Sequence, residues 1–254
     1  MEIHKKKDEV SMHKINEMMD WPVVNKEVRD FLRSAQKQLD GKLGKIEKEA
    51  NEKRVPIIPH ETVAFFVWLF GQINPKEILE IGTAIGFSAG LMAQHTSEES
   101  KITTIDRNPV MLEKAKANFK TLGIEERVTL LEGQADEWLE KLKEDQYDFI
   151  FMDSAKAKYY DFFPDCIRVL KEGGILAVDD VLQGGTILED VKDIPRRRRK
   201  IHKKLNAFLE IVLDHPALDT TLLPLGDGLL LITKKEDYDF SFMKEKESDS
   251  SDSI

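Results

Sequence analysis

Short runs of aliphatic and β-branched residues alternate with stretches of helical periodicity along most of the chain. These runs are residues 78–81, 102–105, 128–131, 149–152, 175–178, 220–224 and 229–233. Such alternation is typical of βαβ units, whose mostly parallel sheet is covered by helices on both faces. Only residues 225–228 separate the last two runs, so we expect an antiparallel hairpin at one edge of the sheet. The pattern predicts an α/β fold with seven strands.

The region before the first strand is predicted to be helical. Apolar residues between positions 24 and 52 follow approximate helical spacing, which indicates one or two amphipathic helices interrupted near Gly41 and Gly44. Pro56 and Pro59 then end this region, because proline disfavours the α conformation in the residue before it. A further helix is predicted over residues 60–70.

We expect three parts along the chain. Residues 1–20 are polar and weakly patterned and are predicted to form an extension, and residues 21–235 form the main domain with its N-terminal helices. Residues 236–254 carry seven acidic residues and two lysines and end in a Ser/Asp-rich stretch. This composition predicts a disordered acidic tail.

Composition narrows the class of protein. A chain of 254 residues with 41% hydrophobic and 33% charged residues can bury one substantial core. No apolar run reaches the roughly 18 residues of a membrane span, and the charged N-terminus has no signal-peptide core. The single cysteine, Cys166, lies in an apolar helical pattern and is predicted to be a buried packing residue. We therefore expect a soluble, cytoplasmic protein with no membrane association.

A glycine-containing turn follows the first strand and is the first candidate ligand site. The segment from Glu80 through Gly82 and Gly86 to Ser88 leads from strand to helix, at the sheet edge where open α/β folds bind ligands. Ala84 replaces the middle glycine of a dinucleotide fingerprint, which leaves less backbone room for a pyrophosphate. The turn therefore favours an adenosyl ligand without phosphates.

Polar residues end the next two strands. Asp106 lies about twenty residues beyond the turn, where a carboxylate can accept hydrogen bonds from ribose hydroxyls. Gln134 and Ala135 follow the third strand and are candidates for contact with the adenine edge. The alternatives are that Asp106 only caps the next helix and that Gln134 is an ordinary surface residue.

Acidic residues follow strands four and five. Asp153 ends strand four, while Asp179 and Asp180 end strand five, so adjacent parallel strands would bring the three carboxylates together. Three close carboxylates repel one another unless a cation lies among them, and an all-oxygen site suits Mg²⁺, Mn²⁺ or Ca²⁺. The alternative is that these acids are loop residues and helix caps.

Lys156 lies three residues beyond Asp153. A divalent ion there would hold a substrate oxygen and lower the pKa of its hydroxyl. If the adenosyl ligand carries a methyl group on a sulfonium, transfer of that methyl group to the oxygen then needs little more than in-line positioning. Lys156 is a candidate general base, or a cation that stabilises the resulting oxyanion. We predict Lys156 and Asp153 as the catalytic residues.

These residues resemble the cation-dependent O-methyltransferases of the catechol and caffeoyl-coenzyme A type. The resemblance covers residues 55–235 and is most specific at 80–86, 153–156, 179–180 and 224–228. It implies a Rossmann-like S-adenosylmethionine (SAM) methyltransferase fold, with five parallel strands and a terminal hairpin. Within this group, residues 55–57, 75–86 and 195–199 are most similar to the bacterial tRNA 5-hydroxyuridine methyltransferases.

The resemblance assigns roles position by position. The metal ligands would be Asp153, Asp179 and Asp180, and the family usually has Asn where this chain has Asp180. Asp106 replaces a frequent Glu. Relatives commonly dimerise through their N-terminal helices, so a homodimer is expected. Together with the glycine turn, the positions expected to contact the cofactor are Ile58, Glu80, Gly82, Ser88, Asp106, Gln134, Ala135 and Asp153.

A basic run bears on the choice of substrate. Seven of the nine residues from Arg196 to Lys204 are Arg or Lys, and Arg196, Arg197, Arg198 and Arg199 are consecutive. Such a patch is a candidate for phosphate contacts with RNA, although the arginines could instead pair with Asp190 and Asp193.

Three functions therefore stay open. The first is methylation of 5-hydroxyuridine at the tRNA wobble position, since its hydroxyl and neighbouring carbonyl could chelate a metal as a catechol does. The second is methylation of small catechol-like or phenolic metabolites. The third is a non-catalytic SAM-binding module, which the acidic cluster and Lys156 argue against.

Overall fold

The computed structural model describes residues 24–244. The predicted extension (1–20) and the last part of the predicted tail (245–254) lie outside the described residues. The strands are β1 (Glu77–Ile81), β2 (Lys101–Asp106), β3 (Val128–Glu132), β4 (Tyr147–Met152), β5 (Leu170–Val178), β6 (Leu218–Leu223) and β7 (Leu229–Lys234). The α-helices are α2 (Lys26–Ala35), α3 (Gly41–Glu52), α4 (His60–Ile73), α5 (Phe87–His95), α6 (Pro109–Leu122), α7 (Ala135–Leu139), α8 (Tyr159–Val169) and α9 (Arg199–Val212). Short 3₁₀ helices are η1 (Glu125–Arg127), η2 (Lys156–Lys158), η3 (Gln183–Leu188), η4 (Arg196–Arg198) and η5 (Ser241–Met243).

The seven strands form one sheet, as the alternating pattern predicts. Their order is β3-β2-β1-β4-β5-β7-β6, with β1 to β5 parallel. β7 runs antiparallel to both β5 and β6, which confirms the predicted terminal hairpin. Because β1 and β4 are neighbours in the middle of the sheet, the residues that follow them meet at its carboxyl edge.

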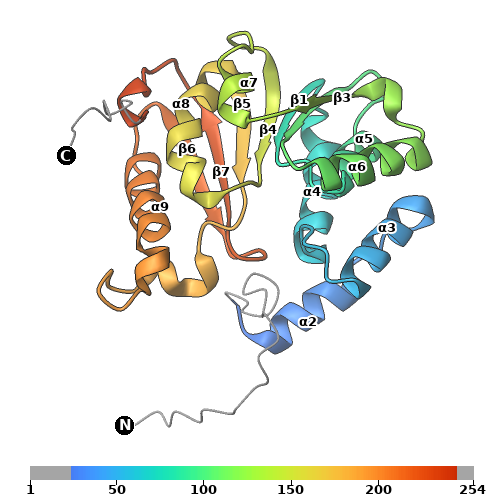
Figure 1. The fold of residues 1–254 in the computed structure, drawn as a ribbon, viewed down its shortest axis with the longest axis horizontal. Helices are drawn as coiled ribbons and strands as arrows, with labels where there is room; N and C mark the ends of the chain where they lie inside the picture. Colours follow the sequence, from blue (N-terminus) through green and yellow to red (C-terminus); the bar gives the residue numbers. More distant parts are fainter. Residues whose placement is uncertain (1–23, 245–254) are drawn as a thin grey trace, which may run out of the picture.

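Helices cover both faces of the sheet (Figure 1). Alternate residues of β4 point to opposite faces, so Phe149 and Phe151 belong to one apolar core while Ile150 and Met152 belong to the other. The first core is completed by α3, α4, α5 and α6, and the second by α7, α8 and α9. Both faces of the central strands are thus buried, which explains their nearly continuous apolar sequence.

Local sequence signals define many of the helix ends. Asn108 caps α6 by accepting hydrogen bonds from the backbone N–H groups of Val110 and Met111, and Pro109 occupies the first turn. Gly123 ends the same helix in the left-handed conformation. α4 begins at His60 as predicted and continues to Ile73.

Two expectations for the ends of the domain need correction. The N-terminal helices separate at residues 36–40, and Gly44 lies inside α3, where a Cβ atom would come 2.3 Å from the carbonyl oxygen of Leu39. Gly44 therefore permits close packing and does not interrupt a helix. A disordered tail starting at position 236 is also wrong for residues 236–244, because Phe240 and Met243 are buried in the core on the α8 side.

Among residues 24–244, no helix is long and apolar enough to cross a membrane. Cys166 is buried, as predicted, and burial raises the pKa of its thiol far above the usual value. This cysteine is a packing residue of the core beside α8.

Candidate active site

The glycine turn after β1 approaches the end of β4 very closely. Gly82 has a φ of +110°, and a Cβ atom there would lie 1.8 Å from the carbonyl oxygen of Asp153. The positive φ and this close approach each exclude any residue other than glycine at this position. Across the sheet, the Asp106 carboxylate accepts a hydrogen bond of 2.8 Å from the N–H of Ala84. The turn is therefore fixed from both sides before any ligand binds.

Glu80 is a buried acid beneath this turn. Its carboxylate accepts a hydrogen bond from the Ser88 hydroxyl, and its other oxygen accepts one of 2.5 Å from Thr104. Burial raises the pKa of Glu80 to about 8, although both hydroxyls oppose the shift. Because Ser88 donates its hydroxyl proton to Glu80, its direct contact with a cofactor stays a prediction.

Asp106 and Gln134 lie side by side at the carboxyl edge, because β2 and β3 are paired in register up to Asp106 and Glu132. Asp106 also accepts a hydrogen bond of 2.8 Å from the N–H of Asn108, so it supports the start of α6 as well as the glycine turn. Each carboxylate oxygen can accept a further hydrogen bond. Gln134 is exposed and precedes Ala135 at the start of α7.

The structure brings Asp153, Asp179 and Asp180 into the wall of one cavity. Asp179 and Asp180 are 3% and 6% exposed, and the Asp180 N–H donates a hydrogen bond of 2.9 Å to the Asp179 carboxylate. Burial, followed by repulsion from Asp180, raises the pKa of Asp153 to about 7 and that of Asp179 well above its usual value. Asp180 has a φ of +61°, an uncommon conformation outside glycine that often marks functional sites.

Lys156 reaches this acidic cluster. Its Nζ atom lies 3.2 Å from Oδ2 of Asp180 and 3.7 Å from Oδ2 of Asp227. Asp227 is 2% exposed and also accepts a hydrogen bond from the N–H of Gly184. Burial raises the pKa of Asp227 to about 6. Asp227 was not among the site residues predicted from the sequence, and its place in the short turn between two strands was the available signal.

One ammonium group faces four buried or partly buried carboxylates in this cluster. Within residues 24–244, no set of three or more His, Cys, Asp or Glu side chains is already arranged around a single metal position. The donors nevertheless have the chemistry that Mg²⁺, Mn²⁺ or Ca²⁺ requires, since all are carboxylate oxygens. The excess negative charge fits a bound cation, and the ligand set stays a prediction.

An open cavity of about 580 Å³ leads to these acids. Apolar residues 56–59, including Ile58, form one wall, and α2 and α3 contribute charged and amide side chains such as Arg33, Glu47 and Asn51. None of the residues described there is Phe, Tyr or Trp. The contribution of the N-terminal helices to the site was not predicted from the sequence.

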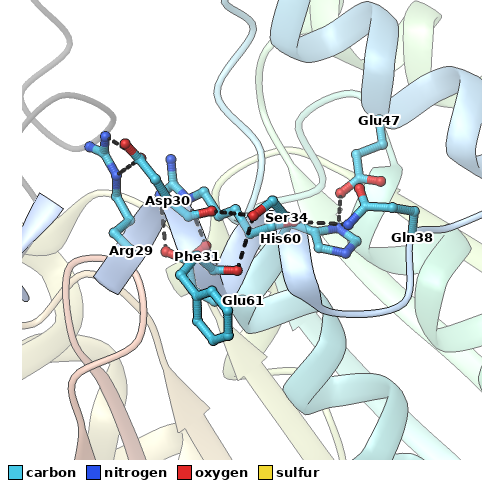
Figure 2. Close-up of polar contacts among 9 residues, drawn as sticks. Arg29, Asp30, Phe31, Ser34, Gln38, Glu47, His60 and Glu61 are labelled. Carbon is cyan, nitrogen blue, oxygen red and sulfur yellow. Dashed lines mark hydrogen bonds and ion pairs between the residues drawn. The ribbon is translucent and has the colours of Figure 1, made fainter. Parts of the chain in front are cut away.

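Buried and partly buried polar contacts hold α2 and α3 in place (Figure 2). Arg33 of α2 forms two hydrogen bonds, of 2.7 and 3.0 Å, with the buried Glu61 carboxylate. His60 Nδ1 lies 2.7 Å from Oε1 of Glu47 in α3, and its Nε2 lies 3.1 Å from the carbonyl oxygen of Lys37. These contacts join both helices to the start of α4.

The basic run does not form one uniform patch. Arg196 and Arg197 are exposed, whereas Arg199 donates hydrogen bonds to the carbonyl oxygens of Ile194 and Lys192. The 3₁₀ helix η4 carries the first three arginines, and Arg199 begins α9. The predicted RNA contact by all four arginines is therefore not supported at Arg199, because this side chain is hydrogen-bonded to the preceding loop.

Comparison with known proteins shows extensive similarity. A family model described as "O-methyltransferase" matches residues 35–235. The catechol O-methyltransferase of Mycobacterium tuberculosis is 30% identical over 162 residues, which cover 63% of this chain and 70% of that protein.

Two solved structures are also similar. A Staphylococcus aureus protein, assigned provisionally as a caffeoyl-CoA O-methyltransferase, is 32% identical with a TM-score of 0.75, covering 82% of this chain and 99% of that one. The Podospora anserina methyltransferase PaMTH1 was solved with S-adenosylhomocysteine bound. It is 25% identical with a TM-score of 0.72, covering 84% and 97% of the two chains.

Proposed function

This chain belongs to the O-methyltransferase family and is a SAM-dependent methyltransferase, and from that premise we propose that it methylates 5-hydroxyuridine at the wobble position of tRNA to 5-methoxyuridine. We further propose that a divalent cation assists the reaction. Family membership sets aside the alternative of a non-catalytic SAM-binding module.

The observation that carries this proposal is the convergence of Asp153, Asp179, Asp180 and Lys156 beside the glycine turn. Such a site suits an acceptor with two adjacent oxygens, one of which loses a proton. The hydroxyl and the neighbouring carbonyl of 5-hydroxyuridine form such a pair. When bound, a divalent cation would stabilise negative charge on the acceptor oxygen.

The cofactor half of the site would hold SAM through groups already in place. Asp106 has lone pairs free for ribose hydroxyls, and the buried Ser154 hydroxyl oxygen next to the turn has no partner among the described residues. Gly82 leaves room where any side chain would collide with Asp153. These features fit a polar ligand that binds at the turn.

Lys156 would handle the acceptor proton. As an amine, its Nζ accepts the hydroxyl proton while the oxygen forms a bond to the methyl carbon and the carbon–sulfur bond breaks. As an ammonium, it instead stabilises the oxyanion. In both cases Asp180 and Asp227 hold the side chain beside the acidic cluster, so its position does not depend on the substrate.

The lining of the cavity favours a polar acceptor. Eleven of its seventeen described lining residues are charged, amide or histidine side chains. A phenolic ring offers few hydrogen-bonding groups to such a lining. A uridine, with its polar base edges and ribose, matches this lining better.

Small catechol-like or phenolic metabolites are the second candidate acceptors. The name of the M. tuberculosis relative favours this alternative. Asp180, where relatives usually have Asn, adds a negative charge that would tighten cation binding and oppose ionisation of either acceptor. A homodimer, a cytoplasmic location and the contacts of Ile58, Gln134 and Ala135 with the cofactor stay predictions.

Nucleoside analysis tests the proposed acceptor. We expect tRNA from a strain lacking the gene to lose 5-methoxyuridine and accumulate 5-hydroxyuridine, as measured by mass spectrometry, and the purified enzyme with SAM to restore the methyl group. An unchanged nucleoside profile together with rapid methylation of catechol would instead support the second candidate.

A further inference from the structure

Arg33 is the residue that α2 contributes to the described lining of the cavity beside the acidic cluster. Its Nε and Nη2 atoms donate hydrogen bonds of 2.7 and 3.0 Å to the two carboxylate oxygens of Glu61, which is 4% exposed. The Arg33 side chain is 32% exposed. One edge of its guanidinium is therefore fixed by the protein, while the side chain remains partly accessible at the cavity wall.

The guanidinium keeps donors for a ligand. An arginine side chain has five N–H groups, and the Glu61 carboxylate accepts hydrogen bonds from two of those of Arg33. The other three have no hydrogen-bond partner among residues 24–244. Because two parallel hydrogen bonds fix the planar group, these remaining donors are held in one orientation before a ligand binds.

The rest of the lining consists largely of hydrogen-bond acceptors. Lys48, the other lysine or arginine of the described lining, is 77% exposed and lies 4.0 Å from a Glu52 oxygen. His60 has an oxygen atom beside each ring nitrogen. Arg33 is therefore a partly buried cation of this wall that can donate to an oxygen of the acceptor. Six carboxylates line the cavity, those of Glu47, Glu52, Asp153, Asp179, Asp180 and Asp227.

Anchoring α2 does not require the spare donors of Arg33. An ammonium group would also neutralise Glu61, whereas a planar guanidinium can bind a carboxylate along one edge and a second oxygen along another. The Arg33–Glu61 pair is neutral as a whole, and the remaining lining is rich in carboxylates. An anionic substrate group would be repelled there, so a neutral carbonyl oxygen is the fitting partner.

The ring of 5-hydroxyuridine carries such an oxygen. Its 5-hydroxyl and C4 carbonyl are the adjacent pair proposed to bind at the acidic cluster. This leaves the C2 carbonyl, on the far side of the ring from the hydroxyl, as a further hydrogen-bond acceptor. Catechol has no corresponding oxygen, so a fixed donor in the cavity wall would favour the uracil ring.

We propose that Arg33 determines acceptor specificity by donating hydrogen bonds to the C2 carbonyl oxygen of the acceptor ring, and that Glu61 is the residue that positions Arg33. This inference rests on the proposed function and deepens it. It assigns the choice between a uracil ring and a phenolic ring to one side chain of α2.

Two acceptors that differ at one edge of the ring test the inference. The first is 5-hydroxyuridine at the wobble position of an anticodon stem-loop. The second is the same stem-loop with the ribonucleoside of 3-hydroxy-4-pyridone, which keeps the adjacent hydroxyl and carbonyl but lacks the second carbonyl. Arg33→Lys keeps a positive charge opposite Glu61 and loses the spare donors. The control, Arg29→Gln, removes an arginine of the same helix that pairs with its neighbour Asp30.

We expect Arg33→Lys to raise the KM for the 5-hydroxyuridine stem-loop by about tenfold or more, because a hydrogen bond from a charged donor is lost. Its KM for the pyridone stem-loop should change by less than about twofold, and kcat should stay near the wild-type value for both. Arg29→Gln should behave as wild type. Should Arg33→Lys fold poorly, the double variant Arg33→Gln, Glu61→Gln removes both charges of the buried pair and should give the same KM ratio.

Equal changes of KM for the two stem-loops would overturn the inference, because Arg33 would then only hold α2 in place. Unchanged KM values for both would overturn it as well. The proposed function would survive either result. Failure of the wild type to methylate the 5-hydroxyuridine stem-loop, together with methylation of catechol, would reject the proposed function itself.

Discussion

Buried acids have different partners in the two halves of the site. The cofactor half contains the glycine turn with Glu80 and Asp106, and the acceptor half is the acidic cluster of Asp153, Asp179, Asp180 and Asp227 with Lys156. Glu80, beneath the glycine turn, has a hydroxyl donor on each oxygen, and Asp106 accepts two backbone N–H groups. In the acceptor half, four carboxylates share one lysine and two backbone N–H groups. Hydrogen bonds within the protein therefore stabilise the acids of the cofactor half, whereas the acceptor half retains an excess of negative charge.

This difference indicates which half depends on an additional ligand. Buried carboxylates that repel one another are costly unless a cation compensates them. Besides burial, repulsion from neighbouring carboxylates contributes to the raised pKa of Asp153 and Asp179, and Lys156 removes only part of it. We therefore expect substitutions in the acceptor half to abolish turnover while sparing the fold, and those in the cofactor half to affect SAM binding and stability.

Removing one acid from the cluster should have the largest effect. We expect Asp179→Asn to lower kcat on the order of 10³-fold, because electrostatic stabilisation of the acceptor oxygen is lost. The melting temperature should stay the same or rise, since repulsion is relieved. The exposed Asp214→Asn is the control. Wild-type turnover by Asp179→Asn would show that the cluster does not take part in catalysis.

Loss of the lysine should cost somewhat less. We expect Lys156→Ala to reduce kcat about 10²-fold without changing the KM for SAM, because proton transfer or oxyanion stabilisation is removed. Lys158→Ala, two residues away and exposed, should retain activity. If both variants behaved alike, Lys156 would have no special role.

The two halves also differ in how far the sequence predicts them. Gly82 and Asp153 directly follow a strand and Asp106 ends one, so the strand pattern places them at one edge without further information. Asp227 and Arg33 join the acceptor half through contacts between segments far apart in the chain. Their approach depends on tertiary packing, such as the Arg33–Glu61 pair, which no local periodicity records.

Residues at the ends of the domain show the same limit. Phe240 lies in an acidic stretch whose composition predicts disorder, yet it packs against Phe163 with ring centroids 5.0 Å apart. The sequence pattern predicts a helix interruption near Gly44, but this glycine lies inside a helix and permits close packing with Leu39. In both cases the deciding contact comes from the folded chain.

A substitution in the cofactor half should separate the two halves kinetically. We expect Asp106→Ala to raise the KM for SAM by about 10- to 100-fold, because a hydrogen bond to a charged group contributes roughly 1.5–3 kcal/mol. The KM for the acceptor should not change. A shift in acceptor KM alone would place Asp106 outside the cofactor site.

The smallest expected effect is a dependence of folding stability on pH, caused by Glu80. Folded Glu80 keeps its proton up to about pH 8, while the unfolded chain loses it near the usual value of 4.5. The folded state thus binds more protons in this window, so its stability is complete below it and falls as pH rises toward 8, by at most roughly 1.4 kcal/mol per pH unit. Thermal melts of wild type and Glu80→Gln measure this, and a steeper decline in Glu80→Gln would contradict it.

The most direct test of the central claim is the melting temperature of the cofactor-free protein with and without Mg²⁺. At a concentration about 100 times the dissociation constant, binding should add about 2.7 kcal/mol, a rise of roughly 5–10 °C. The rise should disappear in Asp179→Asn and persist in Asp214→Asn. The same melting temperature for the wild type with Mg²⁺, Mn²⁺, Ca²⁺ or a chelator would contradict a cation site at this acidic cluster.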